Sequence, residues 1–367
     1  MVACFTRVRL GTLLLIVALN LVGCSAPSLS CVPDCSSAVL AGRDLRGQNL
    51  GGMIFRDADL RRADLRGANL RDADLSSANL SRANLIGADL RGANLRGVQM
   101  QEARMVGTQL EGATLEGADL EGTELSRVAL RGVELTGANL SKALMAGIDL
   151  SGITLIGVVM QGAVLDGANF DGATLSGINL SEALMRGASM VGTDLRGANL
   201  SRAQLYASDL TDARLEGASL IETEADATTM LRANLRGANG YGSYFTGANL
   251  RQVRFDNAVL SGASLQGSDM TGATLSGIVL IDEEKLSPAN LSGAILVNVD
   301  LSGAQADGAI LKGVDLRGAN LQTTVLTSSI ANADGAVVLS AADLNGIIWD
   351  DQTLWPPGFR PDQPPEE

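Results

Sequence analysis

A large apolar residue returns at every fifth position between Ala38 and Asp282, without a slip in register. The 49 central positions run from Leu40 to Leu280 and hold 35 Leu, eight Met and four Phe, the exceptions being Ala225 and Gly240. A small residue, most often Ala, lies two positions before each centre, and Gly lies two positions after it in 31 cases. Each pentapeptide therefore reads small, polar, large apolar, polar, Gly.

This period matches neither of the two regular backbone elements. A helix repeats every 3.6 residues and a strand every two, so neither can keep these centres on one buried face. Recurrent Gly also disfavours a helix, at about 1 kcal/mol for each Gly relative to Ala. The pattern instead predicts a chain that turns a corner every five residues, with Ala and Leu pointing inward and Gly or a short polar residue making the bend.

The repeated motif is Ala-(Asp/Asn)-Leu-x-Gly, as in Ala68-Asn69-Leu70-Arg71 and Ala198-Asn199-Leu200-Ser201. It resembles the pentapeptide-repeat proteins. The resemblance implies an all-β fold, a right-handed quadrilateral parallel β-helix; the spacing by itself gives neither the handedness nor the number of sides. Four sides per coil predict about 16 coils and a rod on the order of 75 Å long, at roughly 4.8 Å per coil. A leucine-rich repeat is the runner-up, but its unit of about 20 to 29 residues has an uneven Leu pattern.

The N-terminus has the order of a secretory signal. Arg7 and Arg9 precede an apolar run that is too short to span a bilayer comfortably. The ending Leu21-Val22-Gly23-Cys24 resembles the lipobox of bacterial lipoproteins, which implies a signal peptide at residues 1–23 and lipid attachment at Cys24. We therefore expect a membrane-anchored, extracytoplasmic protein of the cell envelope. The alternative is an ordinary signal peptide with an incidental Cys.

Residues 24–37 are predicted to form a tether between the lipid and the coil. Cys4 leaves with the signal and Cys24 carries lipid, so Cys31 and Cys35 remain. In an oxidising compartment two such thiols favour a disulfide. We expect it at the open N-terminal end of the coil, where Arg43 and Gln48 occupy positions that are otherwise small.

The regular spacing breaks twice near the C-terminus. After Leu280 the centres resume one residue late, from Leu291 to Leu326, which predicts a one-residue bulge or small loop at a corner. A second break covers residues 327–338. The spacing then returns at Leu339, Leu344, Trp349 and Leu354. We expect the β-helix with its Trp- and Pro-containing cap to cover residues 38–358, and residues 359–367 to form a disordered tail.

Charge and residue chemistry bear mainly on function. The net charge is −13, and it alternates along the chain: residues 41–100 carry ten Arg and seven Asp, whereas residues 101–185 carry four basic and eleven acidic residues. There is no His, and the expected coil holds no Cys, so the usual nucleophile and base sets are missing. Carboxylate pairs such as Asp57 and Asp59 are explained by solubility. We predict no enzyme activity, no cofactor, no metal site and no nucleic-acid partner.

Two functions remain open at this point. The first is a non-enzymatic, membrane-tethered scaffold that binds a protein partner. The second comes from the resemblance: some pentapeptide-repeat proteins imitate duplex DNA and bind type II topoisomerases, which would need a cytoplasmic location and a largely acidic surface.

The candidate partner-binding patch is Tyr206, Tyr241, Tyr244 and Glu224, because all three Tyr occupy outward positions near the weak centres. The alternative is that these Tyr only cover a weak coil. In support of binding, the disturbed rung around Gly240 is expected to give this side a shallow depression. Independently, Phe245 is expected to fill the space left by Ala225, 20 residues earlier.

Overall fold

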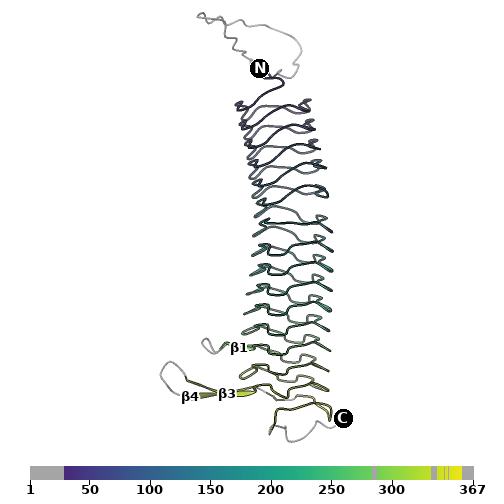
Figure 1. The fold of residues 1–367 in the computed structure, drawn as a ribbon, viewed down its shortest axis with the longest axis vertical. Coiled ribbons are helices and arrows are strands. Elements are labelled where there is room, and N and C mark those ends of the chain that lie inside the picture. Colours follow the sequence, from purple (N-terminus) through teal and green to yellow (C-terminus); the bar gives the residue numbers. More distant parts are fainter. Residues whose placement is uncertain (1–28, 283–286, 332–336, 343, 346, 358–367) are drawn as a thin grey trace, which may run out of the picture.

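The protein is a straight rod of stacked coils, with the two ends of the coil at opposite ends of the rod (Figure 1). This computed structural model describes residues 29–282, 287–331, 337–342, 344–345 and 347–357. The predicted signal peptide, Cys24 and the tail at residues 359–367 lie outside the described residues.

Each five-residue repeat forms one side of a four-sided coil. Its outward residue makes a parallel β-bridge to the residue 20 positions later, as Asp44 does to Asp64 and Asp64 does to Asn84. Outward residues therefore form four columns along the rod. In the described part of the chain, one column contains 16 residues, each one coil from the next, in agreement with the expected number of coils: Asp34, Ile54, Asp74, Asn94, Thr114, Glu134, Thr154, Thr174, Asp194, Arg214, Asn234, Arg254, Thr274, Asp300, Asn320 and Leu354.

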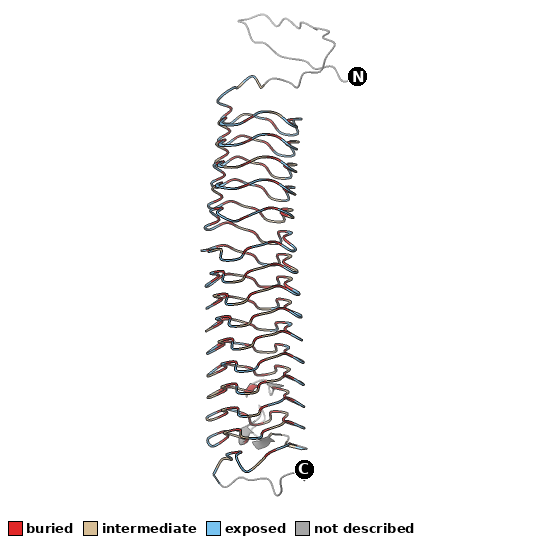
Figure 2. Ribbon diagram, turned by 90° about the vertical axis from the view of Figure 1, so that its right-hand side faces the viewer, coloured by how far each residue is buried: buried red, intermediate tan, exposed pale blue. Residues whose placement is uncertain are grey.

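The interior is a continuous apolar core. The central residue and the small residue two positions before it both point inward, and pairs such as Ala63 and Leu65 are completely buried. Figure 2 shows this burial along the rod as red segments alternating with exposed corners. The predicted inward positions are therefore confirmed.

The corners are type II turns. In each regular repeat the N–H three residues after the centre donates to the carbonyl of the centre, and the second turn residue has φ near +60°. Gly usually occupies this second position because it reaches positive φ without a steric cost. Arg62 (φ 56°), Arg127 (φ 62°) and Ala207 (φ 55°) nevertheless adopt the same conformation.

A regular repeat with Asp or Asn before its centre can satisfy all five of its backbone N–H groups. Two donate to the next coil, one to the preceding coil and one closes the turn. The fifth donates to the Asp or Asn side chain two residues earlier, which explains the preference for Asp and Asn before the centre. For residues 70–74 the donor–acceptor pairs are Leu70 to Asp89 (2.7 Å), Arg71 to Asn69 Oδ1 (3.1 Å), Asp72 to Arg91 (3.0 Å), Ala73 to Leu70 (3.1 Å) and Asp74 to Met53 (2.9 Å).

The coil begins earlier than the sequence predicted. Asp34 already bridges to Ile54, and Cys35 is 1% exposed in the position of a central residue. The expected boundary at residue 38 is therefore wrong, because the small apolar Cys side chain can fill the first rung.

The first interruption is a hairpin and not a one-residue bulge. Strand β1 (Ile281–Asp282) pairs antiparallel with β2 (Ser287–Pro288). The bridge spacing across this point is 26 residues, from Ser264 to Asn290, so the insertion is six residues long. Six inserted residues are one repeat of five plus one residue, so they displace the five-residue pattern by the same one position as a single inserted residue.

The second interruption is also a hairpin, formed by β3 (Thr327–Ala331) and β4 (Val337–Ala341). Leu339 lies in β4 and is not a coil centre, which corrects the prediction. Trp349 is buried as expected, but Leu354 occupies an outward bridging position and is 45% exposed, while Trp355 packs partly against the core. Both hairpins leave the rod at one corner, because Val279 and Val325 share a column (Figure 1).

One stretch of the rod lacks its regular hydrogen bonds between coils. Among the described residues, no backbone hydrogen bond joins residues 129–132 to the coil before or after them. Here β-branched residues replace Ala at small inward positions in two consecutive coils, Val128 under Ile148 and Val133 under Ile153. We infer that these two stacked pairs on adjacent sides together hold the coils apart, since a single stacked pair, Val158 under Ile178, leaves the bridge between Val159 and Asn179 in place. A lone bulky residue such as Val253 leaves the hydrogen bonds around it intact.

Candidate functional site

Between residues 144 and 244, one side of the rod lacks the short polar residues that cover the other three sides. Its outward column, joined by consecutive parallel bridges, runs Leu144, Val164, Leu184, Gln204, Glu224 and Tyr244. We call this column and its two flanking corners the tyrosine side. Over the same coils the other three columns are polar at every position except Val159: Asp149, Asn169, Ser189, Asp209, Thr229, Asn249; Thr154, Thr174, Asp194, Arg214, Asn234, Arg254; Asn139, Val159, Asn179, Asn199, Ser219 and Asn239.

Side chains of the tyrosine side are accessible to a partner. Leu144 is 44% exposed and Tyr244 is 49% exposed, with Glu224 also exposed. Glu224 and Tyr244, both members of the candidate patch, are bridge partners on neighbouring coils. Val164 is half-buried between its neighbours in the column. The column therefore has an apolar half, Leu144 to Leu184, followed by a polar and aromatic half, Gln204 to Tyr244, on one β-ladder.

The other two Tyr lie at the corners that flank this column. Tyr206 is 57% exposed, one coil before Asp226, whereas Tyr241 is half-buried at the opposite corner. The side chain of Asp226 accepts a hydrogen bond from the Thr246 N–H at 2.7 Å, so it is already engaged by the backbone. The structure thus places all three Tyr on or beside one side. The sequence analysis did not identify the apolar part of this side. A comparison of residues 20 positions apart would have identified it, because such residues are neighbours in one column.

The weak centres do not leave a hollow beneath the Tyr. A Cβ added to Gly240 would lie 2.6 Å from Leu260 Cδ2, so the Leu260 side chain already fills that space. Phe245 packs edge-to-face against Phe255, with ring centroids 6.2 Å apart. The expected depression at Gly240 is therefore absent among these described coils, because the core fills the space from the next coil.

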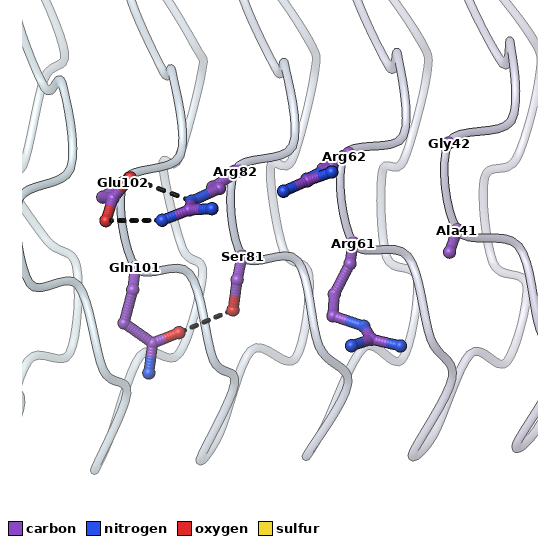
Figure 3. Close-up of a pocket in the computed structure, with 8 residues that line it drawn as sticks. All are labelled: Ala41, Gly42, Arg61, Arg62, Ser81, Arg82, Gln101 and Glu102. Atoms are coloured by element: carbon purple, nitrogen blue, oxygen red, sulfur yellow. Dashed lines mark hydrogen bonds and ion pairs between the residues drawn. The ribbon is translucent and has the colours of Figure 1, made fainter.

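A second feature lies near the N-terminal end of the rod, at the corner that precedes the tyrosine side. It is a shallow groove of about 700 Å³ that spans four coils (Figure 3), lined by Ala41, Gly42, Arg61, Arg62, Ser81, Arg82, Gln101 and Glu102. We call it the arginine groove. The sequence analysis missed it because its residues are 20 apart.

Two of the three groove arginines are neutralised within the chain. Arg61 donates to Asp59 through Nε (2.8 Å) and Nη2 (2.7 Å), and Arg82 donates to Glu102 through Nε (2.9 Å) and Nη2 (3.2 Å). The guanidinium of Arg62 points along the groove toward Arg82 and has no hydrogen bond or ion pair with any described residue (Figure 3). The groove therefore holds one uncompensated positive charge.

Comparison with known families agrees with the fold. The family model described as pentapeptide repeats matches in overlapping segments from residue 34 to residue 322, with short gaps at residues 240 and 278–284. The chain is a pentapeptide-repeat protein. The coils of this family are right-handed quadrilateral β-helices, as the resemblance implied.

Solved pentapeptide-repeat proteins resemble this one in sequence over different shares of its length. HetL of the cyanobacterium Nostoc sp. strain PCC 7120, involved in regulation of heterocyst differentiation, is 29% identical, over 73% of this chain and 92% of HetL, with a TM-score of 0.22. A second protein from Nostoc PCC 7120 is 38% identical over 28% of this chain and 84% of its own, with a TM-score of 0.25. The plasmid-mediated fluoroquinolone resistance protein QnrB1 is 20% identical over 58% of this chain and 91% of its own, with a TM-score of 0.31. No curated protein matches this sequence.

The N-terminal rung of this pentapeptide-repeat protein carries a disulfide. Cys31 and Cys35 are joined, with their Cα atoms 4.9 Å apart. We predict that they are oxidised in the mature protein, and that the bond contributes about 2 kcal/mol because it closes a short loop. Mass spectrometry of non-reduced mature protein should find no alkylatable thiol at either position; two modified Cys would contradict the prediction.

The described residues contain no group of three or more His, Cys, Asp or Glu side chains placed to hold a metal ion. Most outward carboxylates instead have structural partners. Six Asp-Leu-Arg segments form the same ion pair between residues two apart, with N–O distances of 2.6 or 2.7 Å: Asp44 and Arg46, Asp59 and Arg61, Asp64 and Arg66, Asp89 and Arg91, Asp194 and Arg196, and Asp315 and Arg317.

Proposed function

We propose that this pentapeptide-repeat protein is a non-enzymatic rod, anchored to a membrane through lipid on Cys24, and that its tyrosine side binds a protein partner. The observation that carries the proposal is the column from Leu144 to Tyr244, in which three large apolar residues and a Tyr, with Gln204 and Glu224 between them, replace the short polar residues of the other sides. Aromatic residues on a rigid surface supply contact area at little entropic cost, and they are enriched at protein interfaces.

The anchoring part of the proposal is supported by the sequence Leu21-Val22-Gly23-Cys24 and the basic and apolar segment before it. More than one acyl chain on Cys24 would give stable attachment, since one chain alone binds a membrane only marginally. In the part of the chain that the structure describes, no helix has the length and apolarity needed to cross a membrane.

Imitation of duplex DNA is less well supported. A duplex presents an unbroken series of negative charges, whereas carboxylates along this rod alternate with Arg and are engaged by them. Arg96 pairs with Glu116 on the next coil, and Arg202 pairs with Glu222 in the same way. The first coils carry more Arg than Asp.

Site-specific photo-crosslinking in cells tests the partner-binding part. A crosslinking amino acid is placed at Val164 or Tyr244, with Asn169 and Asn249 as controls, since each control lies in the same coil on the next side. We expect one defined adduct from the first pair only. Adducts of equal yield from both pairs, or from neither, would refute a binding surface on the tyrosine side.

The variants Tyr241→Ala and Tyr244→Ala separate binding from folding. We expect them to abolish the adduct formed at Val164 while the thermal unfolding temperature stays nearly unchanged. A large loss of stability with the adduct retained would show instead that the Tyr side chains only cover the coil. Metabolic labelling with a fatty acid, followed by fractionation, tests the anchor: an unlabelled, soluble chain would refute it.

A further inference from the structure

We propose that the arginine groove binds the phosphate group of an anionic lipid headgroup, so that the first coils of the rod rest against the membrane surface. This inference rests on the proposed membrane attachment. It assigns a ligand to a groove that the tyrosine side does not use.

The donors in the groove suit a phosphodiester. Arg62 keeps all five of its N–H donors available with respect to the described residues, and its planar fork matches two oxygens of a phosphate. Arg82 uses Nε and Nη2 for Glu102, which leaves its Nη1 for the same ligand, whereas the Arg61 side chain extends away from Arg62 and Arg82 (Figure 3). Three arginines set against Asp59 and Glu102 leave a charge of 3 − 2 = +1, which a singly charged phosphodiester neutralises.

The groove also lies near the end of the rod where the coil begins. Ala41 and Gly42 form its first rung. Asp34, where the coil begins, is 34 − 24 = 10 residues after Cys24. Ten residues can span at most about 36 Å. The lipid surface that holds Cys24 is therefore within reach of the first coils, where the groove lies.

The ion pair between Arg82 and Glu102 leads to a prediction that one substitution strengthens lipid binding and another weakens it. Glu102 holds Arg82 through two hydrogen bonds and so competes with any anion in the groove. Glu102→Gln removes the competing charge and frees Arg82, so it should strengthen binding. Arg62→Gln removes the free guanidinium and should weaken binding about tenfold, as expected for one charge-assisted bidentate contact.

The experiment uses the full chain purified in a non-ionic detergent. Binding of a fluorescent short-chain phosphatidylglycerol is measured by anisotropy, with phosphatidylcholine and inorganic phosphate as separate probes. The matched control is Arg71→Gln: the Arg71 guanidinium also has no hydrogen bond among the described residues, but it lies at another corner. We expect phosphatidylglycerol to bind, phosphatidylcholine not to bind, and added salt to weaken binding.

Three outcomes would overturn the inference: equal loss in Arg62→Gln and Arg71→Gln, no gain in Glu102→Gln, or equal binding of phosphatidylcholine. Inorganic phosphate that binds as tightly as phosphatidylglycerol, with the same dependence on Arg62, would also overturn the assignment to a lipid. Thermal unfolding of each variant confirms that its fold is intact. The fatty-acid label on Cys24 is measured independently, so failure of the anchor and failure of the groove are distinguishable.

Discussion

The second turn residue of each repeat takes φ near +60° whether or not it is Gly. Ala207 (φ 55°) and Ala227 (φ 56°) have no polar side chain that could compensate for this conformation. A left-handed conformation costs an L-residue roughly 1 to 2 kcal/mol. Such strain is tolerated because the hydrogen bonds on either side of the turn hold the backbone in place.

Ala207→Gly should therefore stabilise the protein, by about 1 kcal/mol, because Gly adopts positive φ without steric conflict. Ala203→Gly is the control. Ala203 is fully buried at an inward position, where loss of a methyl group and gain of backbone freedom should both destabilise. Chemical denaturation measures both variants, and a loss of stability in Ala207→Gly would contradict the strain argument.

The buried rings of Phe245 and Phe255 allow a test of whether Phe245 compensates for the small residue Ala225. Phe245→Ala and Phe255→Ala both lose the same edge-to-face contact, so the difference between them reports their surroundings. Phe245 stacks above Ala225, whereas Phe255 stacks between Leu235 and Leu275. We expect each variant to lose about 3 to 5 kcal/mol, with the larger loss for Phe245→Ala because it leaves the larger cavity. The double variant should cost less than the sum, and equal single losses would argue against compensation for Ala225.

At the scale of one turn, the Asp-Leu-Arg segment combines a backbone cap with an ion pair. Asp194 accepts from the Arg196 N–H at 3.2 Å and from its guanidinium at 2.8 and 2.6 Å. The side-chain hydrogen bond from Arg196 is the main cause that lowers the pKa of Asp194 to about 2, against the opposing effect of partial burial. Asp89 has its pKa lowered to about 2 in the same way by Arg91.

These shifts predict acid sensitivity in a defined pH range. A carboxyl group whose pKa falls on folding stabilises the fold above its unfolded pKa of 3.8, and this contribution is lost as the pH falls toward the folded pKa of about 2. Asp194→Asn keeps an oxygen for the Arg196 N–H but cannot titrate. Its free energy of unfolding should therefore fall less steeply than that of wild type between about pH 4 and pH 2. Identical slopes would show that Asp194 does not contribute to acid unfolding.

At the scale of the whole rod, each coil contacts only its neighbours, so stability varies along the axis. Residues 129–132 lack backbone hydrogen bonds to the described coils before and after them. This stretch is therefore the weakest described connection between the coils that precede it and the coils that follow it. We attribute it to the two stacked pairs of bulky inward residues on adjacent sides, Val128 under Ile148 and Val133 under Ile153. Local opening should therefore begin there and not at the regular coils on either side.

Hydrogen exchange followed by mass spectrometry tests this expectation. Amides of residues 127–135 should exchange faster than those of residues 227–235, whose ladder is complete. Val133→Ala should cost little and slow the exchange of its segment, because it relieves the crowding. Val253→Ala, at a position with an intact ladder, should lose about 2 kcal/mol from the removed methyl groups. Equal losses in the two variants would show that crowding does not cause the gap.

The period, the inward positions and the corners follow from the sequence alone, because each of these depends on a pattern that repeats within five residues. Burial of Leu and Ala and the need for positive φ are local requirements, so they can be read at every repeat. The all-β class and the Cys pair near the first rung were also expected from the residues and the family resemblance.

The register after each interruption, and the residues of neighbouring coils that meet, follow only from the tertiary structure. The six-residue insertion at β1 and β2 was read as one residue because a period of five cannot distinguish the two. Leu354 was assigned to the core in place of Trp355 for a related reason, since a hairpin resets the register. The tyrosine side, the arginine groove and the gap at residues 129–132 each join residues 20 apart. Which residues meet in this way depends on the number of sides per coil, and that number is set by closure of the coil, a property of no single repeat.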